Sequence, residues 1–131
     1  GYRTIKKYAE KYASEKGKDL LIIPAQETET NKGDVLVYGL EETIPKKTEL
    51  ATTIDIAHEH GGVVVLAHPH NFIFTNRMLN RIKNYKFDGV ETHNFLYPNF
   101  INQRIHALMS KFPHLFKLAG EDAHFWWEIG W

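Results

Sequence analysis

Apolar runs alternate with amphipathic segments along the chain, which predicts strands separated by helices. Four large apolar residues from Val63 to Leu66 predict a strand that is buried on both faces. The other predicted strands cover residues 19–24, 34–40, 87–90 and 115–119. The predicted helices cover residues 3–16, 48–60, 76–85 and 99–112. This order predicts an α/β fold with a mostly parallel sheet or barrel.

The composition describes one globular domain of 131 residues. Sixteen basic and 16 acidic residues give zero net charge, so no overall charge attracts nucleic acid or an acidic membrane. The chain has no cysteine, which excludes disulfides, thiolate metal sites and a cysteine nucleophile. We find neither a signal-peptide pattern nor an apolar run of about 18 residues, so we expect a cytoplasmic location and no membrane partner.

Imidazoles and carboxylates follow several of the predicted strands. The chain has 8 histidines, and His68 and His70 come directly after the strand at 63–66. The groups that follow the four predicted strands are Glu27, then His68 with His70, then Glu91 with His93, then Asp122 with His124. Because parallel strands end on one face, we expect these groups to converge there. Nitrogen and oxygen ligands without thiolate suit Zn, Mn or Fe.

Three segments resemble signatures of the PHP domain, a family named for polymerase and histidinol phosphatase. They read IIPAQE, VVLAHPHNF and LAGEDAH, and a fourth segment, DGVETHN, is similar to the family's strand with a glutamate and a nearby asparagine. The similarity covers essentially the whole chain. It implies a distorted, TIM-barrel-like (β/α)7 barrel with roughly two or three divalent metal ions. It also implies metal ligands at Glu27, His68, Asp122 and His124, with Glu27 bridging two ions.

The chain departs from the family pattern in two places. The family's opening His-x-His strand, aspartate and Thr-Asp-His segment are absent, so we expect a partial barrel that lacks its first strand. On this interpretation residues 1–131 are one domain truncated at both ends, which by itself binds metal poorly and associates through its open edge. Asp34 stands where the family often has a ligand histidine, which leaves open whether it binds metal or marks the loss of one ion. Glu121 replaces the signature serine.

The predicted function is hydrolysis of phosphate mono- or diesters by metal-activated water. Glu27, His68, Asp122 and His124 are the predicted catalytic residues, and Asp34 is added to them as a fifth metal ligand. The predicted substrate-binding residues are His70, His93 and Asn94, because imidazoles can contact phosphate or protonate a leaving oxygen. The substrate is expected to be a phosphorylated small molecule, nucleotide or oligonucleotide, and the oligomeric state is open.

Two other classes of protein remain as alternatives. An amidohydrolase-like barrel usually places a lysine at a strand end, whereas Lys117 lies within a predicted strand. A degenerate domain with a structural or interaction role would account for Asp34 and Glu121 as signs of decay. The remaining histidines and the basic run are interpreted as solvated groups: His58, His60, His106, His114, Arg77, Arg81, Lys83 and Lys86.

Overall fold

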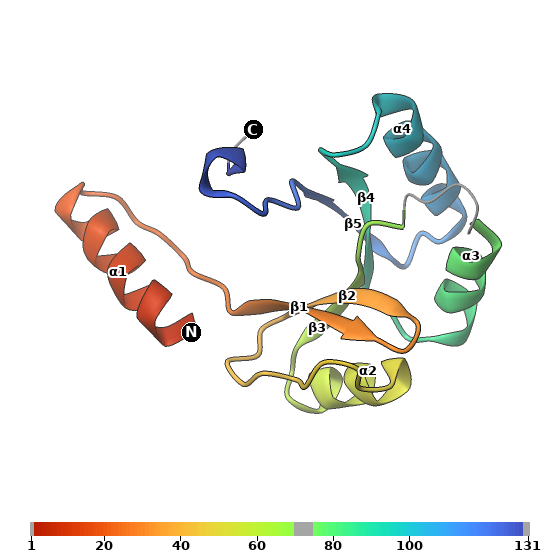
Figure 1. Cartoon of the computed structure of the whole chain (residues 1–131), viewed down its shortest axis with the longest axis horizontal. Coiled ribbons are helices and arrows are strands. Elements are labelled where there is room, and N and C mark those ends of the chain that lie inside the picture. Colours follow the sequence, from red (N-terminus) through yellow and green to blue (C-terminus); the bar gives the residue numbers. More distant parts are fainter. Residues whose placement is uncertain (1, 70–74, 130–131) are drawn as a thin grey trace.

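Five strands form one open, mixed sheet in the computed structural model, which describes residues 2–69 and 75–129 (Figure 1). The strands follow one another in sheet order as β1 (Ala25–Thr30), β2 (Gly33–Tyr38), β3 (Val63–Leu66), β4 (Gly89–Asn94) and β5 (Phe116–Gly120). The pairs β1–β2 and β2–β3 are antiparallel, whereas β3–β4 and β4–β5 are parallel. The α/β class is confirmed, but the sheet is not mostly parallel.

The prediction of a partial (β/α)7 barrel is wrong. Among the described residues β1 and β5 are the two edges of the sheet, so the sheet does not close. The cause lies between the first two strands, where Asn31 and Lys32 reverse the chain in a two-residue hairpin turn. Thr30 fixes this turn, because its hydroxyl donates to the Gly33 carbonyl oxygen at 2.5 Å and accepts from the Lys32 amide at 3.1 Å. Gly33 supplies the positive φ, 104°, that the turn needs.

The strand predicted at residues 19–24 is also wrong. This segment has no regular secondary structure, and the side chains of Leu20, Leu21 and Ile23 are exposed. The strand begins at Ala25 instead, since the hairpin pairs Ala25 with Tyr38. Glu27 therefore lies inside β1 and not after its end.

Three helices cover one face of the sheet. They are α2 (Leu50–Glu59), α3 (Thr75–Asn84) and α4 (Asn99–Leu108), close to their predicted bounds, and α4 continues into a 3-10 turn, η2 (Met109–Lys111). The buried core joins these helices to alternate positions of β2, β3 and β4, and it includes Val35, Val37, Leu50, Ile54, Val64, Leu66, Met78, Ile82, Val90 and Ile105. The intervening positions project from the other face of the sheet, and they include Leu36 and Val65 beside Glu27 and Asp34.

Helix α1 (Tyr2–Glu15) stands apart from the sheet (Figure 1). It forms as predicted, but Ala13 is its buried residue, while Ile5, Tyr8 and Tyr12 are exposed. A short 3-10 turn, η3 (Trp126–Glu128), follows β5. Within residues 2–69 and 75–129, no helix combines the length and apolar character needed to cross a bilayer.

Candidate metal centre

Two carboxylates on the hairpin lie on the face of the sheet that the helices leave uncovered. Glu27 of β1 pairs with Leu36 of β2, and Asp34 precedes Leu36 by two positions. Paired residues, and residues two apart, project from the same face of a sheet. The buried neighbours Thr28 and Val35 project from the opposite face, toward the helices. The antiparallel hairpin therefore brings Glu27 and Asp34 together on this face.

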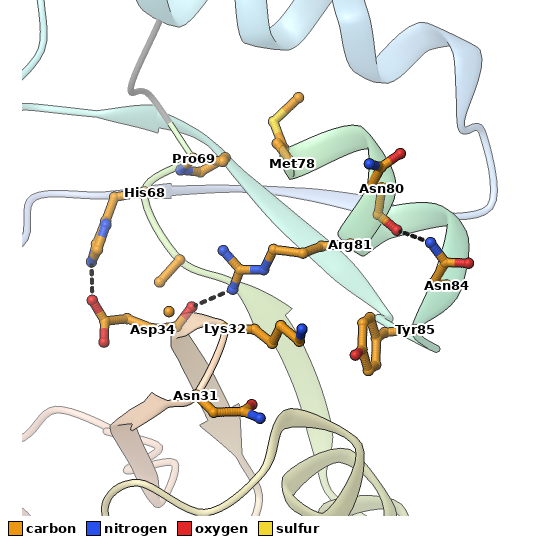
Figure 2. A pocket seen from close by; sticks show the side chains of 12 residues that line it. Asn31, Lys32, Asp34, His68, Pro69, Met78, Asn80, Arg81, Asn84 and Tyr85 are labelled. Carbon is orange, nitrogen blue, oxygen red and sulfur yellow. Dashed lines mark hydrogen bonds and ion pairs between the residues drawn. The ribbon is translucent and has the colours of Figure 1, made fainter. Parts of the chain in front are cut away.

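His68 joins these carboxylates from the loop after β3. Its Nε2 lies 2.9 Å from Oε1 of Glu27 and 3.9 Å from Oδ2 of Asp34, and Figure 2 shows its ring turned toward Asp34. The backbone of His68 has a φ of 24°, in a region that residues other than glycine rarely adopt. Such strain is typical of functional sites, where surrounding contacts hold it in place.

These three side chains fit a divalent cation. Glu27, Asp34 and His68 each offer one ligand atom, and these atoms all lie within 4.8 Å of one another. Donors on one tetrahedral ion, each about 2.0–2.2 Å from it, lie about 3.3–3.6 Å apart, so the side chains would move closer together to bind the ion. Two carboxylates and one imidazole suit Mn, Zn or Fe.

Glu91 of β4 holds the backbone of His68. Its Oε2 accepts the His68 amide at 2.6 Å, and its Oε1 accepts from Nδ2 of Asn94 at 3.5 Å. A register shift between Glu91 and His93 interrupts the alternation of the strand. As a result Glu91 and Asn94 are both buried, whereas His93 is exposed. Gly120 of β5 leaves room for this carboxylate, because a Cβ at Gly120 would overlap Oε1 of Glu91.

The electrostatics couple these groups. Burial acts to lower the pKa of His68, but the hydrogen bond and charge of Glu27, with the charges of Asp122 and Glu91, raise it overall. Burial raises the pKa of Glu91, and the amide and imidazole of His68 oppose that shift. The carboxylates therefore stabilise the protonated imidazole of His68. The same negative charges would stabilise a bound cation.

Asp122 and His124 follow β5. Asp122 has a positive φ of 52°, and its charge acts on both His68 and Glu91. The imidazole of His124 is exposed, and its Nδ1 lies 2.8 Å from the carbonyl oxygen of Asp122. The charge of Asp122 thus acts on His68 of the three-ligand group, whereas the structure does not bring His124 into that group. The ligand roles of both residues stay predictions.

The predicted substrate-binding residues have different surroundings. His70 lies outside the described residues. His93 is exposed on β4. Asn94 is fully buried, and its side chain is engaged at both ends, by Glu91 and by the amide of Leu96 at 2.9 Å. This geometry favours a role for Asn94 in positioning Glu91.

Sequence reasoning missed Arg81, which lines a groove of about 950 Å³ beside His68 and Asp34 (Figure 2). The basic run that contains Arg81 was interpreted as a solvated helix face, yet Arg81 is partly buried. A signal was present, because Arg81 comes three residues after Met78 and therefore borders the apolar face of α3. The sequence indicates Glu91 as a carboxylate that follows a strand, but residue spacing does not predict its hydrogen bond with the His68 amide.

No known family model matches the chain. An uncharacterized protein of Methanocaldococcus jannaschii is 32% identical over 121 residues, which cover 82% of this chain and 48% of that protein. The chain thus spans about half the length of this relative. The relative's name carries no activity, so the resemblance to the PHP domain stays a prediction.

Proposed function

We propose that the chain is a metal-dependent phosphoester hydrolase. The observation that carries the proposal is the group of Glu27, Asp34 and His68, whose ligand atoms lie within 4.8 Å of one another. His68 and Asp34 also line the groove of about 950 Å³, so a substrate in the groove would contact this group directly. A cytoplasmic location belongs to the same proposal.

Each residue of the group has a distinct task in this proposal. Glu27, Asp34 and His68 hold a divalent ion, which would supply activation of a water molecule and polarisation of a phosphoryl oxygen. His68 would bind the ion through Nε2 in its neutral form, and the proton between Nε2 and Glu27 would pass to solvent, because metal ligands must be deprotonated. Glu91 fixes the strained His68 backbone by accepting its amide hydrogen at 2.6 Å.

The residues after β5 extend the proposal to further ions. Asp122 is close enough for its charge to raise the pKa of His68, so an ion near this carboxylate would share the anionic surroundings of the first. Asp122 stays a ligand in the proposal. His124 would become a ligand only after its loop rearranges. That rearrangement would break the contact of its Nδ1 with the Asp122 carbonyl oxygen.

The test compares the chain with two histidine variants. Mn²⁺ binding is measured by titration calorimetry with Mn²⁺ raised to millimolar concentrations. Hydrolysis of an aryl phosphate is followed at saturating Mn²⁺. We expect His68→Ala to abolish both, and His106→Ala, which changes an exposed histidine on α4, to alter neither.

Two results would separate the alternatives. An unmodified chain that binds no Mn²⁺, Zn²⁺ or Fe²⁺ would refute the proposal and favour a structural or interaction role. A chain that binds metal and hydrolyses an amide substrate, but no phosphate ester, would favour the amidohydrolase-like alternative.

A further inference from the structure

Arg81 is the one cation of α3 that the hairpin turn partly covers, among the side chains that the structure describes. Its Nη2 donates to the carbonyl oxygen of Asp34 at 3.3 Å. A Cβ at Gly33 would lie 3.1 Å from Nη1, so the guanidinium packs directly over this glycine. Figure 2 shows the side chain reaching from α3 across the groove to the start of β2.

The guanidinium has unused hydrogen-bonding capacity. It carries five N–H donors, and among the residues that the structure describes the contact with Asp34 uses one of them. Its Nε is buried and has no hydrogen-bond partner within residues 2–69 and 75–129. Burial lowers the pKa of Arg81 and the charge of Asp34 opposes this shift, but an arginine side chain stays cationic at neutral pH. A buried donor without a partner is costly, so an acceptor from a bound molecule would be stabilising here.

The position of this cation relates it to the candidate metal centre. Asp34 contacts Arg81 through its backbone carbonyl and His68 through its carboxylate, so the guanidinium contacts a member of the three-ligand group directly. Lys32, exposed in the hairpin turn, adds a second positive charge to the lining of the groove. On the far side of Arg81 the groove is lined by the aromatic ring of Tyr85 and the amide of Asn84.

We infer that Arg81 binds the phosphoryl group of a phosphate ester whose organic part lies along α3 toward Tyr85. This inference rests on the proposed function. Guanidinium forks match phosphate oxygens with two parallel N–H donors, and they do so better than an ammonium group. The phosphoryl group then lies between Arg81 and the metal group, with its remaining oxygens directed to His68 and Asp34. Gly33 borders the same site, because a Cβ there would lie 3.1 Å from Nη1 and the guanidinium would have to shift by a few tenths of an ångström.

The experiment uses inorganic phosphate as the probe. Its dissociation constant is measured by calorimetry on the Mn²⁺-loaded chain and on three variants: Arg81→Met, Arg81→Lys and Lys83→Met. Lys83 is the matched control, since it is exposed on the same helix and its replacement removes the same charge. We expect about a tenfold or larger loss for Arg81→Met, a smaller loss for Arg81→Lys, and less than about a twofold change for Lys83→Met.

The controls distinguish this inference from the proposed function. Mn²⁺ affinity and urea unfolding are measured for every variant, so that misfolding or loss of metal is recognised. If Arg81→Met fails either test, Arg81→Gln takes its place. Equal phosphate affinity for Arg81→Met and Lys83→Met, with Mn²⁺ bound, would overturn the inference and leave the proposed function standing. If the unmodified chain binds no Mn²⁺, the proposed function fails, and the titration is repeated without metal. Phosphate binding that is lost in Arg81→Met and kept in Lys83→Met would then still support the inference. If the unmodified chain binds no phosphate, the inference is overturned.

Discussion

The Nε2 atom of His68 lies 2.9 Å from Oε1 of Glu27, although the two residues are 41 positions apart in the chain. The contact joins the first strand of the sheet to the loop after the third. It depends on the hairpin, which turns Glu27 and Asp34 to the face that the helices leave open. In the metal-free chain this short contact is a hydrogen bond, and with a cation present the same two atoms would become ligands.

The stability of the metal-free chain should depend on pH through His68. The pKa of His68 is raised above its ordinary value of 6.5 in the folded chain, so the protonated imidazole stabilises the fold. This stabilisation is fully present below pH 6.5 and is lost as the pH rises through the raised pKa. We expect the midpoint of urea unfolding, measured in EDTA, to fall over this window, and to fall less in His68→Gln. Parallel pH profiles for the two proteins would contradict this assignment.

Metal affinity should follow the opposite trend with pH. A proton and a divalent ion compete for Nε2 of His68, so Mn²⁺ binding should tighten as the pH rises through the same window. Calorimetry in buffers of different ionisation enthalpy would count the protons released. We expect Mn²⁺ binding to release protons in the unmodified chain and not in His68→Gln. An Mn²⁺ affinity that does not change with pH would refute the competition between the proton and the ion.

The role of Asp34 can be tested by replacing its carboxylate. We expect Asp34→Asn to weaken Mn²⁺ binding by at least about tenfold, because even the loss of a residue that only supports a ligand costs about 10–100-fold. Asp34→His should retain binding, since imidazole is an alternative ligand at this position. Glu29→Gln is the matched control, because Glu29 pairs with Asp34 across the hairpin and loses the same charge. Equal effects of Asp34→Asn and Glu29→Gln would show that Asp34 acts only through its charge.

Glu91 should stabilise the fold through the amide of His68. Glu91→Ala removes the acceptor of a 2.6 Å hydrogen bond and should lower the free energy of unfolding by about 1–3 kcal/mol. Glu91→Gln keeps an acceptor oxygen and should cost less than the alanine variant. Urea unfolding measures both changes, and equal losses for the two variants would contradict the proposed role of the acceptor.

Shortening a buried side chain in the strand before His68 should destabilise the fold. Leu66 is fully buried and packs in the core between β2 and the helices. Leu66→Ala should therefore lower the free energy of unfolding by about 2–5 kcal/mol. A loss below about 1 kcal/mol, measured by urea unfolding, would mean that the core at this strand is not packed as described.

The sequence predicts the helices and three of the strands well, because apolar periodicity and buried runs are local properties. Val63 to Leu66 is a strand as expected, and α2 and α4 begin within two residues of their predicted starts. The pairing of strands is not local, and it was the source of the error. Residues 26–30 of β1 carry no large apolar side chain, so the apolar pattern indicates no strand there, and the two-residue hairpin at Asn31 and Lys32 is not predicted.

The candidate site was partly predictable for the same reason. Residue type and position after a predicted strand indicated Glu27 and His68, and the resemblance to the PHP domain indicated Asp34; the structure brings the three together. The positioning role of Glu91 depends on a strand irregularity, and the burial of Arg81 depends on the packing of α3 against the hairpin turn. The strand irregularity leaves no pattern in the chain that distinguishes Glu91 from an ordinary strand carboxylate. The spacing of Arg81 from Met78 indicates that Arg81 borders the apolar face of α3, but it does not indicate the contact with the hairpin turn.

The most direct test of the metal centre is pulsed electron paramagnetic resonance of the chain with less than one equivalent of Mn²⁺. The account predicts that the spectrum contains modulation from the ¹⁴N nucleus of a coordinated imidazole, that His68→Gln loses it, and that His106→Gln keeps it. A spectrum of the unmodified chain without imidazole modulation, or an imidazole signal that survives in His68→Gln, would contradict the assignment of Glu27, Asp34 and His68 as the metal-binding group.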